Sequence, residues 1–410
     1  MGVAEELFSQ ALGVERPWQV TRIDFDRIKR QLNLSLDFPR GSTFPCPLCN
    51  QSSVVHDTTE KRWRHLNFFE HECYLTARVP RVSCTIHGVH QVSLPWARSG
   101  SGFTLLFEAL AMILVREMPV AAAGRILGVH DNRLWRIMGY YVDKAREHAD
   151  YRFVTAIGVD ETSIRKHHQY VSIVVDLAES QTIFAAEGKG SAILEQFVGD
   201  LEAHGGSGND ITEVSIDMSP AFISGVDEHL PHAAITFDKY HVVKVINDAV
   251  DQVRRMEAKT VHDLKRLRYA FLKNRRNLSL HQRKAIERLE SLPGRLCKTI
   301  RAMHLRESFQ SLYQEPSRGE FTLGLKKWYW WASHSRLEPM KDAARTIRKH
   351  WDGILRWWDS RITNGVLEGL NSLIQAAKAK ARGYRTSRNF ITMIYLLTGK
   401  LDFGRTGLPT

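Results

Sequence analysis

The chain has 410 residues, of which 43% are hydrophobic and 25% are charged, a composition typical of a folded globular protein and unlike that of a disordered one. Its 57 Lys and Arg against 45 Asp and Glu give 57 − 45 = +12, which favours a polyanionic partner such as nucleic acid. The sequence contains no apolar run of about 18 residues and no basic start followed by an apolar core. We therefore expect no membrane span and no secretory signal, and a cytoplasmic, nucleoid-associated protein.

The first 100 residues contain two short pairs of metal-ligating side chains. Cys46 and Cys49 form CPLC, and Cys84 and His87 form CTIH. Five cysteines are too few for a disulfide scaffold, whereas two close pairs supply the four ligands of a tetrahedral structural Zn²⁺. His90 is the second choice for the fourth ligand. The basic and aromatic segment between the pairs is expected to form two strands of a zinc ribbon.

Residues 101–150 have the apolar period of helices, and MPVAAAGRILGVHDNRLWRIMGYYV predicts a helix-turn-helix. Gly124 would let two helices approach closely, and Gly128 suits a turn that requires a positive φ. The second helix would begin at about Asp131. It would present three side chains to a DNA major groove, namely Asn132, Arg133 and Arg136.

From Phe153 the pattern changes to strands bounded by Gly, Asp and Ser. The segments FVTAIGVDE, YVSIVVDL and TIFAAEGK precede a helix, ILEQFVGDLEAHG, and two further strands follow in TEVSID and AAITFD. Three strands, a helix, a strand, a helix and a fifth strand form the element order of an RNase H-like α/β core.

Three acids are placed where such a core would hold metal ions. Asp160 is expected at the end of the first strand and Asp217 at the end of the fourth, and residues just past strand ends line the site crevice of open sheets. Glu368 is expected on a late helix, where Asn371, Gln375 and Lys378 share one polar face with it. Phosphodiester chemistry with two Mg²⁺ (or Mn²⁺) ions about 4 Å apart needs convergent oxygen ligands of this kind.

Two other features of this region are assigned lesser roles. Glu161 would point to the opposite face of the strand from Asp160 and is left outside the metal site. Asp238 and His241, in FDKYH, form a possible accessory pair close to the metals.

From Lys239 to the end almost the whole chain has helical spacing. Between His241 and Glu320, 18 Lys and Arg against 9 Asp and Glu give 18 − 9 = +9. We expect Arg275 and Arg276, together with Lys378 of the late helix, to contact DNA.

These segments resemble one family, the ISL-three family of bacterial insertion-sequence transposases, over nearly the whole chain. The matching pieces are CPLC, CTIH, AAAGRILGV, VDETS, IDMSPAF, FDKYHVVK and TNGVLEGLNSLIQ…KARGYR. The resemblance implies that Asp160, Asp217 and Glu368 are the catalytic DDE triad and the Mg²⁺ ligands. The long interval of 368 − 217 = 151 positions resembles transposases whose RNase H-like fold is interrupted by an all-helical insertion.

The sequence therefore predicts a multidomain α/β chain with five parts. These are a zinc-binding domain (1–100), a helix-turn-helix (101–150), the first part of the RNase H-like core (151–244), a basic helical insertion (245–350) and the last part of the core with the catalytic Glu (351–410).

The predicted function is a DNA transposase that binds transposon-end inverted repeats in double-stranded DNA, cuts them and joins them to target DNA. It would use two Mg²⁺ (or Mn²⁺) and one structural Zn²⁺, and act as a homodimer on paired ends. Two alternatives remain at this stage: a sequence-specific repressor without catalysis, and an RNase H-like nuclease that does not rejoin DNA.

Overall fold

The computed structural model describes residues 2–165, 169–291, 297–360 and 365–409, so the start of the TNGVLEGL motif lies outside the described residues. In these residues, none of the helices combines the length and the apolar content needed to span a bilayer. The contacts divide the chain into two compact units, Met1–His148 with Leu401–Thr410, and Ala149–Lys400.

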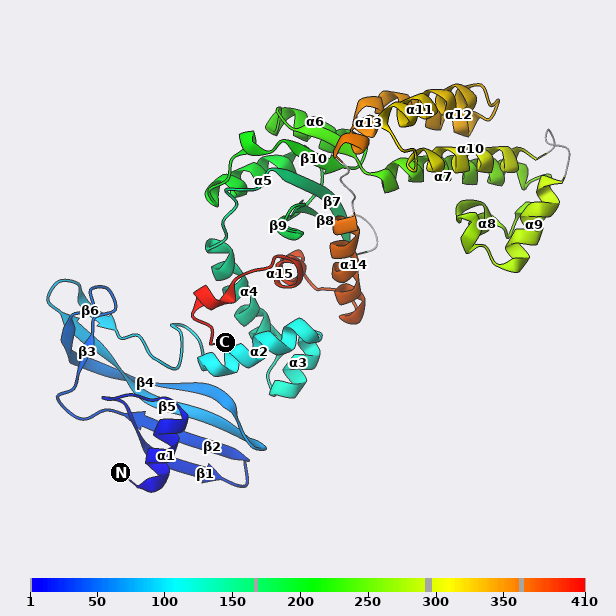
Figure 1. Ribbon diagram of the computed structural model, residues 1–410. Helices are drawn as coiled ribbons and strands as arrows, with labels where there is room; N and C mark the ends of the chain where they lie inside the picture. The colour runs from blue at the N-terminus through cyan, green and yellow to red at the C-terminus, as the bar shows by residue number, and fades with distance from the viewer. Residues whose placement is uncertain (1, 166–168, 292–296, 361–364, 410) are drawn as a thin grey trace. The chain divides into compact units, whose positions relative to one another are not determined.

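The first unit begins with a short helix and a six-stranded sheet (Figure 1). Four of its strands lie in the order β1-β2-β5-β4, with β3 beside β4 and β6 beside β5. The elements are α1 (Val3–Ala11), β1 (Gln19–Asp26), β2 (Gln31–Asp37), β3 (Thr43–Pro45), β4 (Ser52–Phe68), β5 (His71–Cys84) and β6 (Gly88–Gln91). The long β4–β5 hairpin confirms the two strands expected between the Cys pairs.

Three helices follow the sheet, α2 (Leu105–Glu117), α3 (Val120–Leu127) and α4 (Asp131–Glu147). Both glycine predictions are confirmed. Gly128 caps α3 with φ 67°, and a Cβ at Gly124 would lie 2.7 Å from the carbonyl oxygen of Val129. The short helix η4 (Phe403–Thr406) packs on α4, so the last ten residues belong to this unit by their contacts.

A buried carboxylate fixes the position of α2 against α4. The fully buried Glu108 accepts hydrogen bonds from Arg98 Nε at 2.9 Å, Ser101 Oγ at 2.7 Å and the Tyr141 hydroxyl at 2.7 Å. A buried charge is tolerated only when it is paired and hydrogen-bonded, and Glu108 meets both conditions.

The second unit is built on a five-stranded sheet with the order β11-β10-β7-β8-β9 (Figure 1). The strands β7, β8 and β9 are antiparallel, while β10 and β11 run parallel to β7. The observed order of strands and helices confirms the predicted one. The elements are β7 (Ala156–Arg165), β8 (Gln169–Asp176), β9 (Gln181–Glu187), α5 (Ser191–Ala203), β10 (Glu213–Ile216), α6 (Pro220–His229) and β11 (Ala234–Phe237).

One strand end was predicted wrongly. Asp160 lies inside β7, which continues to Arg165, and not at its end. The antiparallel partner β8 pairs with β7 from Ile157 onwards to Arg165, whereas the parallel partner β10 pairs with it only as far as Gly158. Asp160 is therefore two residues past the end of the parallel pairing, which keeps it at the sheet edge where Asp217 follows β10.

A group of helices follows β11 and packs around α7, α10, α11 and α12 (Figure 1). The elements are α7 (Lys239–Glu257), α8 (Arg268–Leu272), η3 (Arg275–Asn277), α9 (Leu280–Glu290), α10 (Lys298–Leu312), α11 (Arg318–Ser333), α12 (Glu338–Lys349) and α13 (Trp351–Ser360). Their buried side chains join those of the sheet in one apolar core. Because α7 is continuous, the domain boundary predicted at residue 245 falls inside a helix.

The last two helices, α14 (Gly365–Lys380) and α15 (Ser387–Thr398), return to the sheet. On β9, Thr182 and Thr398 share a hydrogen bond of 2.9 Å between their hydroxyls, and Tyr395 accepts the Ala185 N–H at 2.8 Å. On β7, Leu367 of α14 packs directly over Gly158, where a Cβ would lie 2.5 Å from Leu367 Cδ1.

We expect Gly158→Ala to lower the free energy of unfolding by about 1–3 kcal/mol, because the added methyl group overpacks the contact between β7 and α14. Chemical denaturation measures this change. Gly199→Ala in α5 is the matched control, since a Cβ there meets nothing within 4 Å and should be neutral or slightly stabilising. Leu367→Ala in the Gly158→Ala background should recover part of the loss, and no recovery would contradict this account of the contact.

Candidate active site and metal centre

The two Cys and His pairs meet at one end of the β4–β5 hairpin. Cys46 directly follows β3, and its N–H and carbonyl hydrogen-bond to Gln51 and Asn50, which closes a tight turn that also carries Cys49. Cys84 ends β5, and His87 precedes β6. The sequence prediction that these four residues come together is confirmed by the geometry.

The spacing of the four ligand atoms suits a tetrahedral metal. All lie within 4.8 Å of one another, with Cys49 Sγ to Cys84 Sγ at 3.7 Å and Cys84 Sγ to His87 Nδ1 at 3.7 Å. Zn–S bonds of about 2.3 Å in a tetrahedron place neighbouring sulfurs about 3.8 Å apart. Backbone N–H groups of His87 and Ile86 lower the pKa of the Cys84 thiol to about 6, which favours the thiolate that a metal requires.

His90, the second choice for the fourth ligand, is not part of this cluster. Its ring nitrogen Nε2 lies 2.7 Å from the carbonyl oxygen of His87, and the clustered group contains His87 instead.

Asp160 is held by two donors from different parts of the chain. Its Oδ1 accepts the Glu161 N–H at 2.7 Å, and its Oδ2 accepts Asn371 Nδ2 of α14 at 2.5 Å. Burial raises the pKa of Asp160, and the negative charges of Asp238 and Asp217 raise it further. The two predicted acids of the sheet therefore lie within electrostatic reach of each other.

Asp217 directly follows β10, as predicted, and its Oδ1 accepts the Ser219 N–H at 2.9 Å in the turn that leads into α6. Asp238 directly follows the neighbouring strand β11; it is buried and caps α7 by accepting the Tyr240 N–H at 3.0 Å. Two adjacent parallel strands thus each present a carboxylate at the same edge of the sheet.

His241 supplies a basic side chain to this group of acids. Its Nδ1 lies 2.9 Å from Asp238 Oδ2, and this hydrogen bond raises the pKa of His241. Asp160 and Asp217 raise the same pKa through their charges. The accessory pair predicted from FDKYH is therefore in contact and lies beside the acids.

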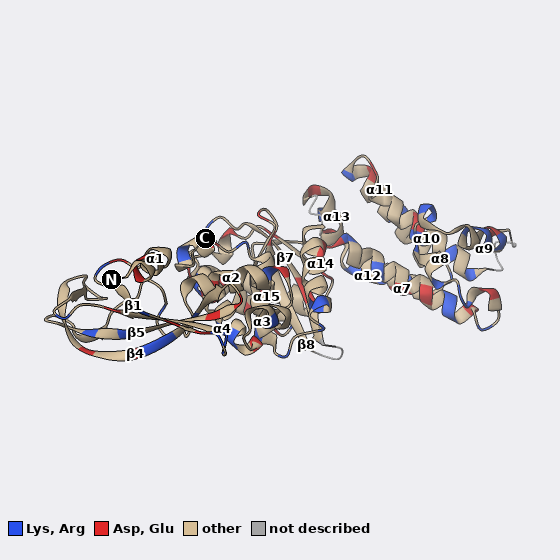
Figure 2. Cartoon of the chain, turned by 90° about the horizontal axis from the view of Figure 1, so that it is seen from below, with Lys and Arg blue, Asp and Glu red and all other residues tan. Residues whose placement is uncertain are grey.

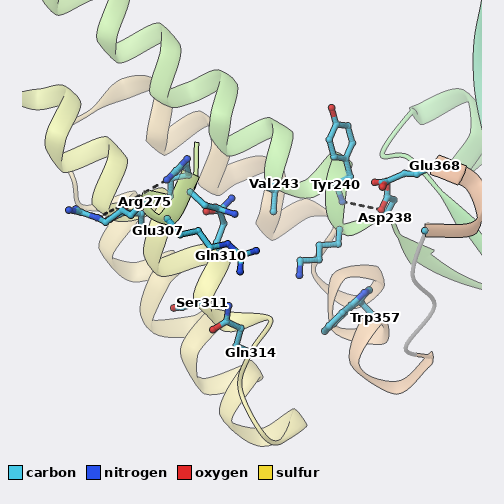
Figure 3. Close-up of a pocket in the computed structure, with 15 residues that line it drawn as sticks. Asp238, Tyr240, Val243, Arg275, Glu307, Gln310, Ser311, Gln314, Trp357 and Glu368 are labelled. Atoms are coloured by element: carbon cyan, nitrogen blue, oxygen red, sulfur yellow. Dashed lines mark hydrogen bonds and ion pairs between the residues drawn. The ribbon is translucent and has the colours of Figure 1, made fainter. Parts of the chain in front are cut away.

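Glu368 approaches the same region from the first turn of α14. It is exposed and lines a groove of about 920 Å³ together with Asp238 (Figure 3). Figure 3 shows the Glu368 side chain directed toward Asp238. Among the described residues, only the Cys and His group has ligand atoms of three or more side chains mutually within 4.8 Å, so the acids face one region without touching a common point.

The polar face predicted for α14 is confirmed, and the structure shows what it contacts. Asn371 donates to Asp160, Gln375 donates to Thr162, and Lys378 Nζ donates to Ser163 Oγ at 3.2 Å. The sequence analysis missed Thr162 and Ser163. The signal for Thr162 was its place two residues after Asp160 in a β-branched continuation of the strand, which puts both side chains on one face. No sequence pattern identified Ser163.

The predicted DNA-reading residues are on the surface of α4. Asn132, Arg133 and Arg136 are all exposed. The Arg133 guanidinium lies over the Phe103 ring at 4.1 Å, which holds it in one orientation.

The two arginines predicted to contact DNA from the insertion differ in their surroundings. Arg275 pairs with Glu290 at 2.5 Å and with Glu307 at 2.9 Å, and these two carboxylates raise its pKa. Arg276 is exposed beside it. Figure 2 shows Lys and Arg on several helices of this region with acidic residues between them. Whether a given Lys or Arg is available to DNA therefore depends on whether an acidic side chain already pairs with it.

Comparison with family models assigns each of these regions. A transposase DDE model of the ISL3 family matches residues 157–394, which is more than half of the chain. The helix-turn-helix domain model of transposase family ISL3 matches residues 92–142, and the zinc-finger model of transposases IS204/IS1001/IS1096/IS1165 matches residues 42–87. The chain belongs to the ISL3 family of transposases.

Individual relatives agree along almost the full length. The transposase for insertion sequence element IS1557 of Mycobacterium tuberculosis is 26% identical, with 95% of this chain and 94% of the relative covered. The transposase for insertion sequence element IS1001 of Bordetella parapertussis is also 26% identical, with 94% and 96% covered.

This ISL3-family protein is a DNA transposase, an enzyme that acts on DNA, with its zinc ribbon, helix-turn-helix and DDE domains in that order. The predicted function is confirmed, and a repressor without catalysis is disfavoured because the DDE domain is present as well as the DNA-binding domains.

We expect metal analysis of the purified transposase to find about one Zn²⁺ per chain. His87→Ala should reduce the zinc content and destabilise the first unit, because structural zinc contributes folding free energy directly. His90→Ala is the matched control and should keep its zinc, since only His87 is in the cluster. Zinc loss in the His90 variant with retention in the His87 variant would reverse the ligand assignment.

We further expect Arg136→Ala to reduce the preference for transposon ends over random duplexes by about 1–3 kcal/mol, the value of one good base-edge contact. Binding curves on both duplexes measure this difference. Arg125→Ala, an exposed arginine of α3, should leave the preference unchanged. Equal losses on end and random DNA in the Arg136 variant would mean that it contacts phosphate and not bases.

Proposed function

We propose that the Ala149–Lys400 unit is an RNase H-like catalytic core, interrupted after β11 by a helical insertion of α7 to α12. Support comes from the strand order β11-β10-β7-β8-β9, with β7 to β9 antiparallel and β10 and β11 parallel to β7. The insertion separates α14 from β7 by many residues in the sequence, yet α14 packs against β7 in the fold.

Within this core, Asp160, Asp217 and Glu368 are the catalytic triad and hold two Mg²⁺ (or Mn²⁺) ions. One observation carries this proposal. Asp160 on β7 and Asp217 after β10 both lie just past the end of the parallel pairing between these two strands, and Glu368 of α14 faces the same edge of the sheet. Such ions would activate the attacking oxygen and stabilise the leaving oxygen.

The donor set fits hard divalent cations, which take oxygen ligands. The negative charges of Asp217 and Asp238 add to burial in raising the pKa of Asp160, and bound cations would relieve this cost. In addition, the buried Asn371 Oδ1 accepts no hydrogen bond within the described residues, although its Nδ2 positions Asp160. An orphaned oxygen beside Asp160 is a further polar group available to a hydrated ion.

The reaction would proceed in two steps of the same type. Water attacks the phosphodiester at a transposon end and releases a 3′-hydroxyl, and that hydroxyl then attacks a target phosphodiester in line. Asn371 orients Asp160, and His241 holds Asp238 while placing positive charge beside the acids. No covalent bond between protein and DNA is formed.

End recognition would belong to the zinc ribbon and helix-turn-helix of residues 1–150, and phosphate contacts to Arg276. Arg275 and Lys378 are the weaker candidates, because two acids already pair with Arg275 and Lys378 Nζ already donates to Ser163. A homodimer would pair the two ends of one element, and it would act at the nucleoid, where both DNA substrates lie.

The test is a metal-dependent assay of cleavage and joining on duplexes that carry the element's ends. Asp160→Asn, Asp217→Asn and Glu368→Gln should each lower both activities by more than about a hundredfold, because a ligand is lost with little change in volume. End binding should remain. Glu161→Gln is the matched control and should retain activity, and a Glu368→Gln variant with normal cleavage would remove that residue from the triad.

The same assay separates rejoining from simple hydrolysis. Pre-cleaved ends with a free 3′-hydroxyl should be joined to a supercoiled target by the wild type, whereas a nuclease of this fold would leave them unjoined. Asp238→Asn and His241→Ala should lower joining by about ten- to a hundredfold, the range typical of residues that position ligands.

A further inference from the structure

The groove that contains Glu368 continues away from the acids toward the insertion. Its walls come from α7, η3, α10, α13 and the start of α14. Figure 3 shows Gln310 of α10 and Gln314, just past its end, on one side, and Asp238, Glu368 and Trp357 on the other. At about 920 Å³ the groove has the size of a small-molecule pocket, which is enough for a nucleotide or two of one strand.

Among the described residues, the buried Arg306 side chain in the groove has fewer hydrogen-bond acceptors than its guanidinium can use. Arg306 lines the groove and is only 1% exposed, yet its Nε and Nη1 have no hydrogen-bond partner within the described part of the chain. Its Nη2 donates to the Lys273 carbonyl at 3.1 Å, and Glu307 Oε1 is 3.6 Å away. A buried guanidinium with two unused donor nitrogens costs stability, so the position favours an acceptor that arrives from outside.

The rest of the lining supports an anion at this point. Of the four cations, Arg275 is occupied by Glu290 and Glu307, which leaves Lys239, Arg276 and Arg306. Lys239 Nζ lies over the Tyr313 ring at 4.5 Å, which holds it at the groove wall. Gln310, Gln314 and Asn274 add neutral donors.

We propose that this groove binds an unpaired DNA strand next to the catalytic acids, with the positive charges of Arg306, Lys239 and Arg276 attracting one phosphodiester group. The proposal rests on the proposed function for the position of the reacting phosphate. Tyr240 is 60% exposed and lines the same groove, so its ring offers a stacking face for a base of that strand. The substrate of this site would thus be a DNA end whose terminal nucleotides are unpaired.

Fluorescence anisotropy with a short oligothymidine and a duplex of equal length tests this, using the full chain in EDTA so that no cleavage is needed. Arg306→Met should weaken oligothymidine binding about tenfold or more while duplex binding changes little. Inorganic phosphate should compete with oligothymidine on the wild type and less on the variant. No measurable oligothymidine binding by the wild type would overturn the proposal.

Arg288→Met is the matched control, because it removes one arginine of α9 that is 80% exposed and does not line the groove. It should affect both probes weakly and alike. Thermal unfolding separates the binding role of Arg306 from a structural one. We expect the melting temperature to change little, because two of the three guanidinium nitrogens make no hydrogen bond within the described residues and only Nη2 donates, to the Lys273 carbonyl.

Unchanged oligothymidine affinity in Arg306→Met, or a loss that comes with a lower melting temperature, contradicts the proposal. If Arg306→Met does not fold, the exposed Arg276→Met is measured in its place. An unchanged affinity of Arg276→Met for oligothymidine would overturn the proposal. Because binding is measured without metal, this result is independent of whether the triad variants lose cleavage.

Discussion

The contact between α14 and β7 is the interaction on which the catalytic unit depends. Glu368 is 368 − 160 = 208 positions after Asp160 in the chain, and most of the intervening residues belong to helices outside the sheet. Leu367 packs against Gly158, and three polar side chains about one helical turn apart donate to Asp160, Thr162 and Ser163 in order along the strand. The apolar contact thus sets the distance between α14 and β7, and the hydrogen bonds set the position of α14 along the strand. As a result, Glu368 faces the acids.

The same contact explains how the strand can carry Asp160 in its middle. The antiparallel pairing with β8 extends β7 past the end of its parallel neighbour, and α14 covers the extension. The carboxylate is therefore placed on a paired strand and not on a loop, which holds it rigidly where charge must be controlled. Its burial and its acidic neighbours raise its pKa, and His241 offsets part of that cost.

The first unit is held together by the Cys and His cluster and by a buried ion pair. Its long hairpin ends in loops that carry Cys46, Cys49 and His87, and loops of this length have little apolar area with which to fix themselves. Its helices are fixed instead by Glu108, whose three donors come from α4 and from the segment before α2. Arg133 and Arg136 are thereby presented on a supported helix.

The sequence by itself determined the order of the domains, the strand and helix order of the catalytic unit, the four clustered Cys and His residues and the turn glycines of the helix-turn-helix. Each depends on local spacing or on a residue type with few conformational alternatives, such as Gly128 with its positive φ. Only the tertiary structure decided that β7 runs on past Asp160, that His87 and not His90 joins the cysteines, and that Arg306 is buried without enough partners. These outcomes depend on which distant segments pack together, because strand length follows the partner strand and a side chain's environment is set by residues that no local pattern identifies.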